Sequence, residues 1–409
     1  MMRKLLMQSN ICSFKKRWKN SMKRFFADLH IHIGRTFTGK PVKITGAKSL
    51  TFTNIIRHAR NEKGLDIIGI IDCHSPEVIL EIEDLAQKGF VTEHKDGGLQ
   101  YGDLTVIPGS ELEIYDDSCK GPIHVLCYFP TLSAMKDFSA WLTGYLKNIT
   151  LSSQRIYASG RMLQEKVKEL DGLFIPAHVF TPFKSLFGKG VERSLSEVFD
   201  PDLIDAIELG LSADTMMADQ IAELHRYTFL TNSDAHSLKK IAREYQVLEM
   251  EAPTFAELHK ALTGKEKCRV KANYGLDPLL GKYHQTVCSE CFGPFDKENG
   301  KCRNCSHHKF IKGVADRISE LKSSGGLPDV RPPYIHQVPL EFIPGLGPKM
   351  LEKLLNHFGT EMAILHDVPF SEISKVIPEK TAMLIGKARE GKLNLQAGGG
   401  GKYGRIVDS

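Results

Sequence analysis

The sequence has no long hydrophobic run. A membrane helix needs roughly 18 or more consecutive apolar residues, and no stretch approaches that length, so we expect no membrane partner. The 409 residues are 42% hydrophobic and 25% charged. This balance is typical of a soluble globular chain long enough for two or three domains.

The chain also lacks the cysteine pattern of a disulfide framework. Its nine cysteines are an odd number, four of them bunched and five scattered, and no signal peptide precedes them. We therefore expect a reducing compartment and a cytoplasmic protein.

Acidic residues are missing from residues 1–24, which carry eight Lys or Arg. Residues 25–280 carry 28 basic and 35 acidic residues, and residues 281–409 carry 18 and 14. We expect residues 1–21 to be a basic extension, either disordered or touching nucleic-acid backbone. The part that follows is acidic, and bound cations would let it accept a phosphate.

Several short apolar runs end in side chains that can bind a metal ion. The first run closes with His30 and His32, which project to the same side of an extended strand. His124 precedes its run instead of following it. The other runs end in Asp72 and His74, Glu111, His178, Glu208, and Asp234 and His236. Chance solvation does not explain this repetition, so the sequence predicts a metal site.

From Met22 to about Asn273, strand-like and helix-like segments alternate. Seven strand-like runs end near His32, Asp72, Glu113, Phe129, Val179, Leu209 and Asn232. Helical periodicity covers residues 50–63, 77–88, 133–147, 153–170, 213–225 and 254–263. Alternation of this kind predicts parallel strands with covering helices. In a closed α/β barrel the chemistry gathers at the carboxyl ends of the strands, where most of these side chains fall.

The ordered set of His, Asp and Glu residues resembles the PHP (polymerase and histidinol phosphatase) superfamily over residues 24–250. The resemblance implies an α/β fold, a distorted seven-stranded (β/α) barrel, and a trinuclear metal cluster that hydrolyses phosphoesters. Many members have a Ser-Asp-Gly-like segment after the His-x-His pair, where this chain has Gly34 to Lys40. Asp72 is our candidate for the ligand from that segment.

The implied metal ligands are His30, His32, Asp72, His74, Glu111, His124, His178, Asp234 and His236, with Glu208 as a further candidate. Asp234, Glu111 and His178 are the expected catalytic residues. Divalent ions suit this chemistry because they neutralise the phosphodiester and generate hydroxide at neutral pH. We expect zinc in the cluster, with magnesium or manganese supporting activity.

Phe180 to Gly190 directly follows His178 and combines three aromatic residues with glycines and lysines. Phe183 and Phe187 are candidates for stacking on an extruded DNA base. The same aromatic residues equally suit a lid packed against the barrel.

Four cysteines form two Cys-x-x-Cys pairs ten residues apart: Cys288, Cys291, Cys302 and Cys305. Each pair supplies two thiolates from one turn, and together they complete a closed tetrahedron. The pattern predicts a structural zinc module.

Beyond a linker at residues 323–333, Pro344 to Lys349 resembles the turn of a helix-hairpin-helix motif. Gly345 and Gly347 allow a tight turn that brings backbone amides against a phosphate, and Lys349 adds charge. The alternative is an ordinary pair of helices in a small bundle. A second, degenerate copy is expected over residues 373–389, and a basic glycine-rich tail follows from Gly398.

The order of these modules resembles the endonuclease Q family over residues 22–407. We expect the extension at 1–21, a PHP domain at 22–275, a four-cysteine zinc module with a linker at 276–335, and a helix-hairpin-helix region with its tail at 336–409. The resemblance implies a nucleoid-associated DNA repair endonuclease that nicks 5′ to uracil, hypoxanthine, xanthine or an abasic site. It also implies DNA, duplex or single-stranded, and a replication sliding clamp as partners.

Without the family resemblance, the residues predict a metal-dependent phosphoesterase attached to DNA-binding modules. The alternative is a PHP-type small-molecule phosphatase with accessory modules. Gly345, Gly347 and Lys349 argue against it, because such a phosphatase needs no contacts with duplex DNA. A third class, a non-catalytic DNA-binding factor, would have lost ligands that this chain retains.

Overall fold

A computed structural model describes residues 22–281, 283–323, 328, 330–396 and 405–406. The predicted extension at 1–21 lies outside these residues, as does most of the glycine-rich tail. No helix among the described residues is long and apolar enough to cross a membrane.

Seven strands form a closed ring, as the sequence predicts: β1 (Lys23–Ile31), β2 (Ile67–Ile70), β5 (Leu104–Ile114), β6 (Ile123–Tyr128), β8 (Leu173–Pro176), β9 (Ile207–Glu208) and β10 (Phe229–Leu230). The ring closes outside the regular ladders. Val179 N donates to Glu208 O at 3.0 Å and so ties the segment after β8 to β9. A parallel bridge between Ile31 and Ala235 ties the segment after β10 to β1.

The strands are not all parallel, which corrects the prediction. β6 runs antiparallel to both β5 and β8. β5 and β6 are joined by residues 115–122, whereas a parallel pair needs a crossover of a dozen or more residues. The sheet is therefore mixed, within the predicted α/β class.

The sheet extends beyond the ring in two places: β11 pairs with β1, and β4 pairs with β5. The order β17-β12-β11-β1-β2-β5-β4-β3 includes β11 (Tyr245–Met250) and β12 (Arg269–Gly275), which the sequence reading missed. β3 (Thr92–Glu93), β4 (Leu99–Tyr101), β7 (Arg155–Ile156) and β17 (Tyr334–His336) are short additions. β17 pairs with β12, so the predicted zinc-module segment begins and ends on neighbouring strands.

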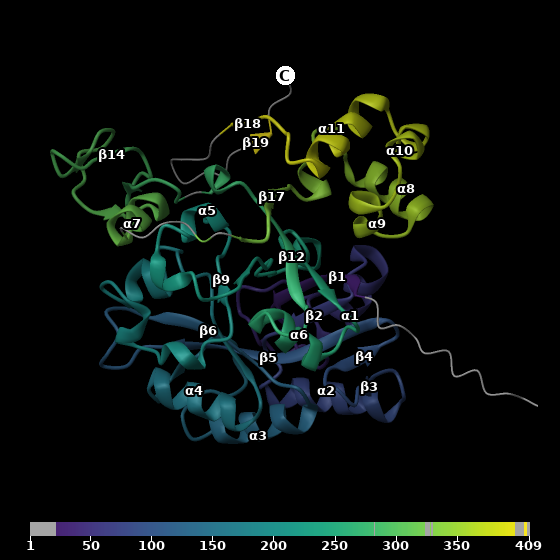
Figure 1. The fold of residues 1–409 in the computed structure, drawn as a ribbon, viewed down its shortest axis with the longest axis horizontal. Coiled ribbons are helices and arrows are strands. Elements are labelled where there is room, and N and C mark those ends of the chain that lie inside the picture. Colours follow the sequence, from purple (N-terminus) through teal and green to yellow (C-terminus); the bar gives the residue numbers. More distant parts are fainter. Residues whose placement is uncertain (1–21, 282, 324–327, 329, 397–404, 407–409) are drawn as a thin grey trace, which may run out of the picture.

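Helices cover the outside of the ring, with α2, α3 and α4 along its lower face in Figure 1. Their bounds are α1 (Phe52–His58), α2 (Pro76–Gln87), α3 (Leu132–Leu142), α4 (Gly160–Glu169), α5 (Thr215–Ala218) and α6 (Phe255–Thr263). A π-helical turn, Ala59–Lys63, continues α1. Apolar side chains of these helices pack on the strands and leave one end of the ring for the polar residues.

Three predicted helices are shorter than expected; the one predicted at 133–147 ends at Leu142. Residues 153–159 are not helical because Arg155 and Ile156 pair with β5 as β7, and Ser159 caps α4. The helix predicted at 213–225 is broken into α5 and the 3-10 turn Ala222–Leu224. Arg331 donates to the carbonyls of Leu224 and Tyr227, so a tertiary contact satisfies carbonyl groups at the end of this segment.

Two smaller regions lie above the barrel in Figure 1. One contains β13 (Val287–Cys288), β14 (Phe295–Asp296), β15 (Lys301–Cys302), β16 (Phe310–Ile311) and α7 (Val314–Leu321). The other contains α8 (Pro348–Phe358), α9 (Glu361–His366), α10 (Phe370–Val376) and α11 (Glu379–Arg389), followed by β18 (Leu395–Gln396) and β19 (Arg405–Ile406). A buried ion pair between Lys63 and Glu361, 2.9 Å, joins the helices to the barrel.

Candidate metal centre

Three groups of potential ligands meet at one end of the ring. They are His30, His32 and Glu111; His32, Asp234 and His236; and Glu111, His124 and His178. Within each group the ligand atoms lie within 4.8 Å of one another. His32 and Glu111 each belong to two groups, so the three form one connected cluster. The fold thus brings together seven of the nine predicted ligands, a geometry suited to several ions.

The strand directions explain why His124 precedes its apolar run. β6 is antiparallel to β5, so the start of β6 lies at the same end of the ring as the side chain of Glu111. His178 and Asp234 follow β8 and β10 with φ of 32° and 46°. Residues other than glycine rarely occupy this region, and such residues cluster at functional sites. A Cβ at Gly210 would lie 2.6 Å from that of His178, so the turn requires glycine there.

His30 in β1 and His32 directly after it present unpaired nitrogens to the cluster. His30 Nδ1 lies 3.0 Å from both carboxylate oxygens of Glu208, and His32 Nδ1 lies 3.0 Å from Asp72 Oδ2. Among the described residues, Nε2 of His30, His32 and His124 is buried without a hydrogen-bond partner. A buried polar atom without a partner is costly. A carboxylate at Nδ1 fixes the proton there and leaves the Nε2 lone pair for a metal ion, so these residues fit divalent ions.

Asp72 and His74 lie outside the three groups, so their role as metal ligands stays a prediction. Asp72 Oδ2 accepts from the backbone N–H of Ile33 at 2.7 Å as well as contacting His32. In His74, Nδ1 lies 2.8 Å from the hydroxyl of Ser110, and Nε2 lies 3.3 Å from the carbonyl of Leu151. In this geometry Asp72 and Glu208 orient the ligand histidines from behind.

Lys43 is a site residue that the sequence reading missed. Its Nζ lies 3.2 Å from Glu111 Oε2 and 2.6 Å from the hydroxyl of Ser153. Burial raises the pKa of Glu111, but His124 and Lys43 together hold that pKa well below its usual value. Lys43 stands among several lysines in its loop, and no sequence pattern distinguishes it from the others.

The cluster opens into a cavity of about 450 Å³. Lys43, Asn232, Asp234 and Phe183 are among its lining residues. Nδ2 of Asn232 is buried without a hydrogen-bond partner among the described residues. The cavity therefore offers both cationic and hydrogen-bonding groups next to the cluster.

The aromatic loop after His178 divides its side chains between surface and core. Phe183 is 46% exposed and meets the ring of Tyr283 edge-on at 5.6 Å. Phe187 is fully buried and stacks on Phe180 at 5.5 Å. Phe187 is therefore corrected from a DNA-stacking candidate to a core residue that holds the loop, while Phe183 remains available.

The four cysteines of the predicted zinc module lie within 4.8 Å of one another. Cys288 Sγ is 3.7 Å from Cys305 Sγ, and Cys291 Sγ is 3.4 Å from Cys302 Sγ. Zinc–thiolate bonds of about 2.3 Å in a tetrahedron place sulfurs about 3.8 Å apart. The group fits a structural metal ion, and the identity of that ion stays a prediction.

The predicted hairpin is only partly helical. Gly345 has φ of 82°, and Gly347 caps the start of α8. The segment before the turn is a single 3-10 turn, Leu340–Phe342, in place of a full helix. Lys349 is exposed in the first turn of α8. The helix-hairpin-helix assignment and the roles of Gly345, Gly347 and Lys349 in DNA binding stay predictions.

Comparison with known proteins places this geometry in a family. No family model matches the sequence. The uncharacterized protein YqxK of Bacillus subtilis (strain 168) is 57% identical over 385 residues, which are 94% of this chain and all of that protein.

Two solved structures match nearly the whole fold. The lesion-specific endonuclease PfuEndoQ from Pyrococcus furiosus has a TM-score of 0.81 and 34% identity, covering 94% of this chain and 95% of that one. Endonuclease Q in complex with a 27-mer duplex substrate, with an abasic lesion at the active site, has a TM-score of 0.80 and 33% identity. That match covers 95% of this chain and 97% of the other. The chain therefore belongs to the endonuclease Q family.

Proposed function

We propose that this protein is a lesion-specific DNA repair endonuclease. Its substrates are uracil, hypoxanthine, xanthine and abasic sites in DNA, and it hydrolyses the phosphodiester 5′ to the lesion. The observation that carries the proposal is the histidine and carboxylate cluster, with its unpaired Nε2 atoms, in a chain that matches endonuclease Q over nearly its whole length.

In this proposal His30, His32, Glu111, His124, His178, Asp234 and His236 hold divalent ions, with Asp72 and Glu208 fixing the histidine rings. Such ions, when bound, neutralise the phosphodiester and lower the pKa of water. Glu111, His178 and Asp234 would act by holding these ions at the reacting phosphate; Oε1 of Glu111 lies 3.4 Å from Nε2 of His178. Lys43, which lines the same cavity, orients a phosphate oxygen.

The zinc module and the α8–α11 region serve DNA binding in this proposal. Phosphate contacts position a protein on DNA and carry little sequence information. Lys349 and the exposed glycines at the start of α8 suit such contacts. A sliding-clamp contact and a nucleoid location stay predictions.

The test is a nicking assay with end-labelled duplexes that carry one uracil, hypoxanthine, xanthine or abasic site. Magnesium or manganese is added, and an undamaged duplex and a small phosphomonoester run beside them. We expect nicks at the lesions only, with a product length that maps the cut to the 5′ side. Phosphomonoester hydrolysis without nicking would instead indicate a small-molecule phosphatase. Duplex binding without either reaction would indicate a non-catalytic binding factor.

A further inference from the structure

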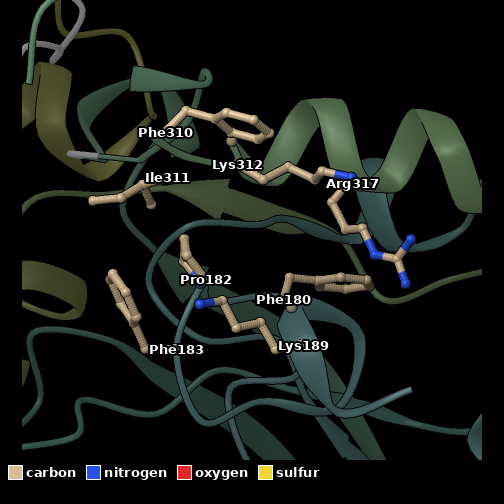
Figure 2. A pocket seen from close by; sticks show the side chains of 10 residues that line it. Phe180, Pro182, Phe183, Lys189, Phe310, Ile311, Lys312 and Arg317 are labelled. Atoms are coloured by element: carbon tan, nitrogen blue, oxygen red, sulfur yellow. The ribbon is translucent and has the colours of Figure 1, made fainter. Parts of the chain in front are cut away.

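A second cavity lies beside the metal centre, between the loop at 180–190 and the zinc module. Figure 2 shows it, with Pro182, Phe183 and Lys189 on one wall and Phe310, Ile311 and Lys312 on the other. Its volume is about 250 Å³. Pockets for drug-sized ligands begin at about 300 Å³, so this crevice suits a smaller group.

Hydrogen bonds join the two walls in this structure. Arg317 of α7 donates from Nε to the carbonyl of Phe187 at 2.8 Å, and from Nη2 to the carbonyls of Val191 and Glu192 at 3.1 and 2.7 Å. These bonds tie the zinc module to the loop across more than a hundred residues of sequence. The zinc module and the loop therefore border the crevice from opposite sides.

The lining combines exposed aromatic rings with ammonium groups. Phe183 is 46% exposed and Phe310 is 49% exposed, one on each wall. Lys189 Nζ lies 5.7 Å from the centre of the Phe183 ring, and Lys312 pairs with Glu320 at the rim. No lining side chain is a carboxylate or an amide. Aromatic rings that stack on a base, together with cations that contact the nucleic-acid backbone, bind nucleotides with little dependence on the identity of the base.

The position of the crevice decides which nucleotide reaches it. Pro182 and Phe183 line both this crevice and the cavity of the metal centre. A deaminated base is distinguished from a normal base by hydrogen bonds to its edge. The metal cavity supplies such groups, for example Asn232, whereas the crevice does not.

We infer that the crevice binds one undamaged, unpaired base next to the lesion on the nicked strand. Phe183 and Phe310 stack on this base, and Lys189 faces its phosphate. The inference rests on the proposed function, because the strand must first lie at the metal centre. By holding the base next to the lesion, the crevice keeps the phosphodiester that is cut in an extended conformation. It adds no sequence preference to the reaction.

The test places 2-aminopurine, whose fluorescence rises when it leaves the DNA stack, at each of the two positions on either side of a single abasic site. The full-length protein carries Asp234→Asn so that the duplex stays intact. Anisotropy of a label at the duplex end shows when binding is saturated. We expect a fluorescence rise at one flanking position, and its loss when Phe183→Ala or Phe310→Ala is added. Loss of one stacking contact should also weaken duplex binding by about tenfold.

Phe90→Ala is the matched control, since Phe90 is 59% exposed and lines neither cavity. It should keep the full fluorescence rise. Saturated binding with no rise at any flanking position, or a rise that survives both aromatic substitutions, would overturn the inference alone. Absence of duplex binding would overturn the proposed function together with it.

Discussion

At the scale of single residues, Asp234 is the most informative position in the cluster. Its Oδ1 lies 3.3 Å from His32 Nε2 and 3.5 Å from His30 Nε2, and its backbone is left-handed. Asparagine tolerates that conformation and has nearly the same volume. Asp234→Asn should therefore lower the nicking rate about 100-fold or more, because a charged ligand is lost. Duplex affinity should change little.

Single-turnover nicking and filter binding measure the two effects of this substitution separately. Asp117→Asn, at an exposed carboxylate outside the cluster, should nick at the normal rate. An Asp234→Asn protein with normal nicking would remove Asp234 from the metal centre.

The residues that could be predicted from the sequence are those that end a strand-like run. Their location at the end of such a run identifies candidate ligands, because the ends of these strands meet at one end of the barrel. These candidates are His30, His32, Glu111, His178 and Asp234. It does not separate a residue that faces the ions from one that supports a ligand from behind, as Asp72 does. Lys43 and the burial of Phe187 depend on loop conformation, which leaves no periodic signal.

At the scale of elements, the predicted zinc module forms one wall of the crevice beside the candidate metal centre. Its β13–β16 and β14–β15 pairs contain two residues per strand, too few to be stable alone. Cys288→Ser should therefore release the bound metal and unfold residues 287–311 locally, since metal binding supplies the folding free energy of such modules.

Atomic spectroscopy for bound zinc, with limited proteolysis of the module, tests this prediction. Cys119→Ser is the control, because Cys119 lies outside the four-cysteine group. Unchanged zinc content in Cys288→Ser would contradict the assignment of this site.

The start of α8 offers a prediction about DNA binding. Lys349 is exposed there beside the amide groups that follow Gly347. Lys349→Ala should weaken binding to damaged and undamaged duplex alike, and should lower the salt dependence of binding by about one phosphate contact.

Filter-binding titrations across a salt series measure the effect of Lys349→Ala. Lys95→Ala, at an exposed lysine between β3 and β4, should leave the slope unchanged. An unchanged slope in Lys349→Ala would place the phosphate contacts elsewhere on the protein.

The sequence predicts elements best where one local rule decides them. The seven ring strands and α2, α3 and α6 follow from apolar periodicity and caps. The antiparallel β6 does not, because it depends on the length of a connection. The module order was visible in the sequence, whereas the contacts that dock the modules join residues hundreds of positions apart.

At the scale of the whole molecule, His366 links the helical region to the barrel. Its ring lies 4.6 Å from that of Phe26, and its Nε2 lies 2.7 Å from the hydroxyl of Tyr245. Burial, followed by the charge of Arg24, lowers the pKa of His366 to about 4. The unfolded chain, with the ordinary pKa of 6.5, then binds the proton more readily than the folded chain. Stability should fall as the pH drops from 6.5 toward 4.

His366→Gln keeps a hydrogen-bonding group that does not titrate, so it should lose less stability than the natural protein between pH 7 and pH 5. The difference should approach about 1.4 kcal/mol for each pH unit where it is steepest. Chemical unfolding of both proteins at several pH values measures it. Parallel pH profiles would show that His366 does not control docking.

The pairing of β17 with β12 has a consequence for how the protein behaves at high concentration. Without β17, the outer edge of β12 would expose a row of unpaired N–H and C=O groups, a template on which a second copy can add its own strand. β17 covers that edge with three residues, Tyr334–His336, and so short a strand is itself a poor template. The segment that returns from the zinc module therefore acts as a guard against aggregation, and any shortened form of the protein should keep it.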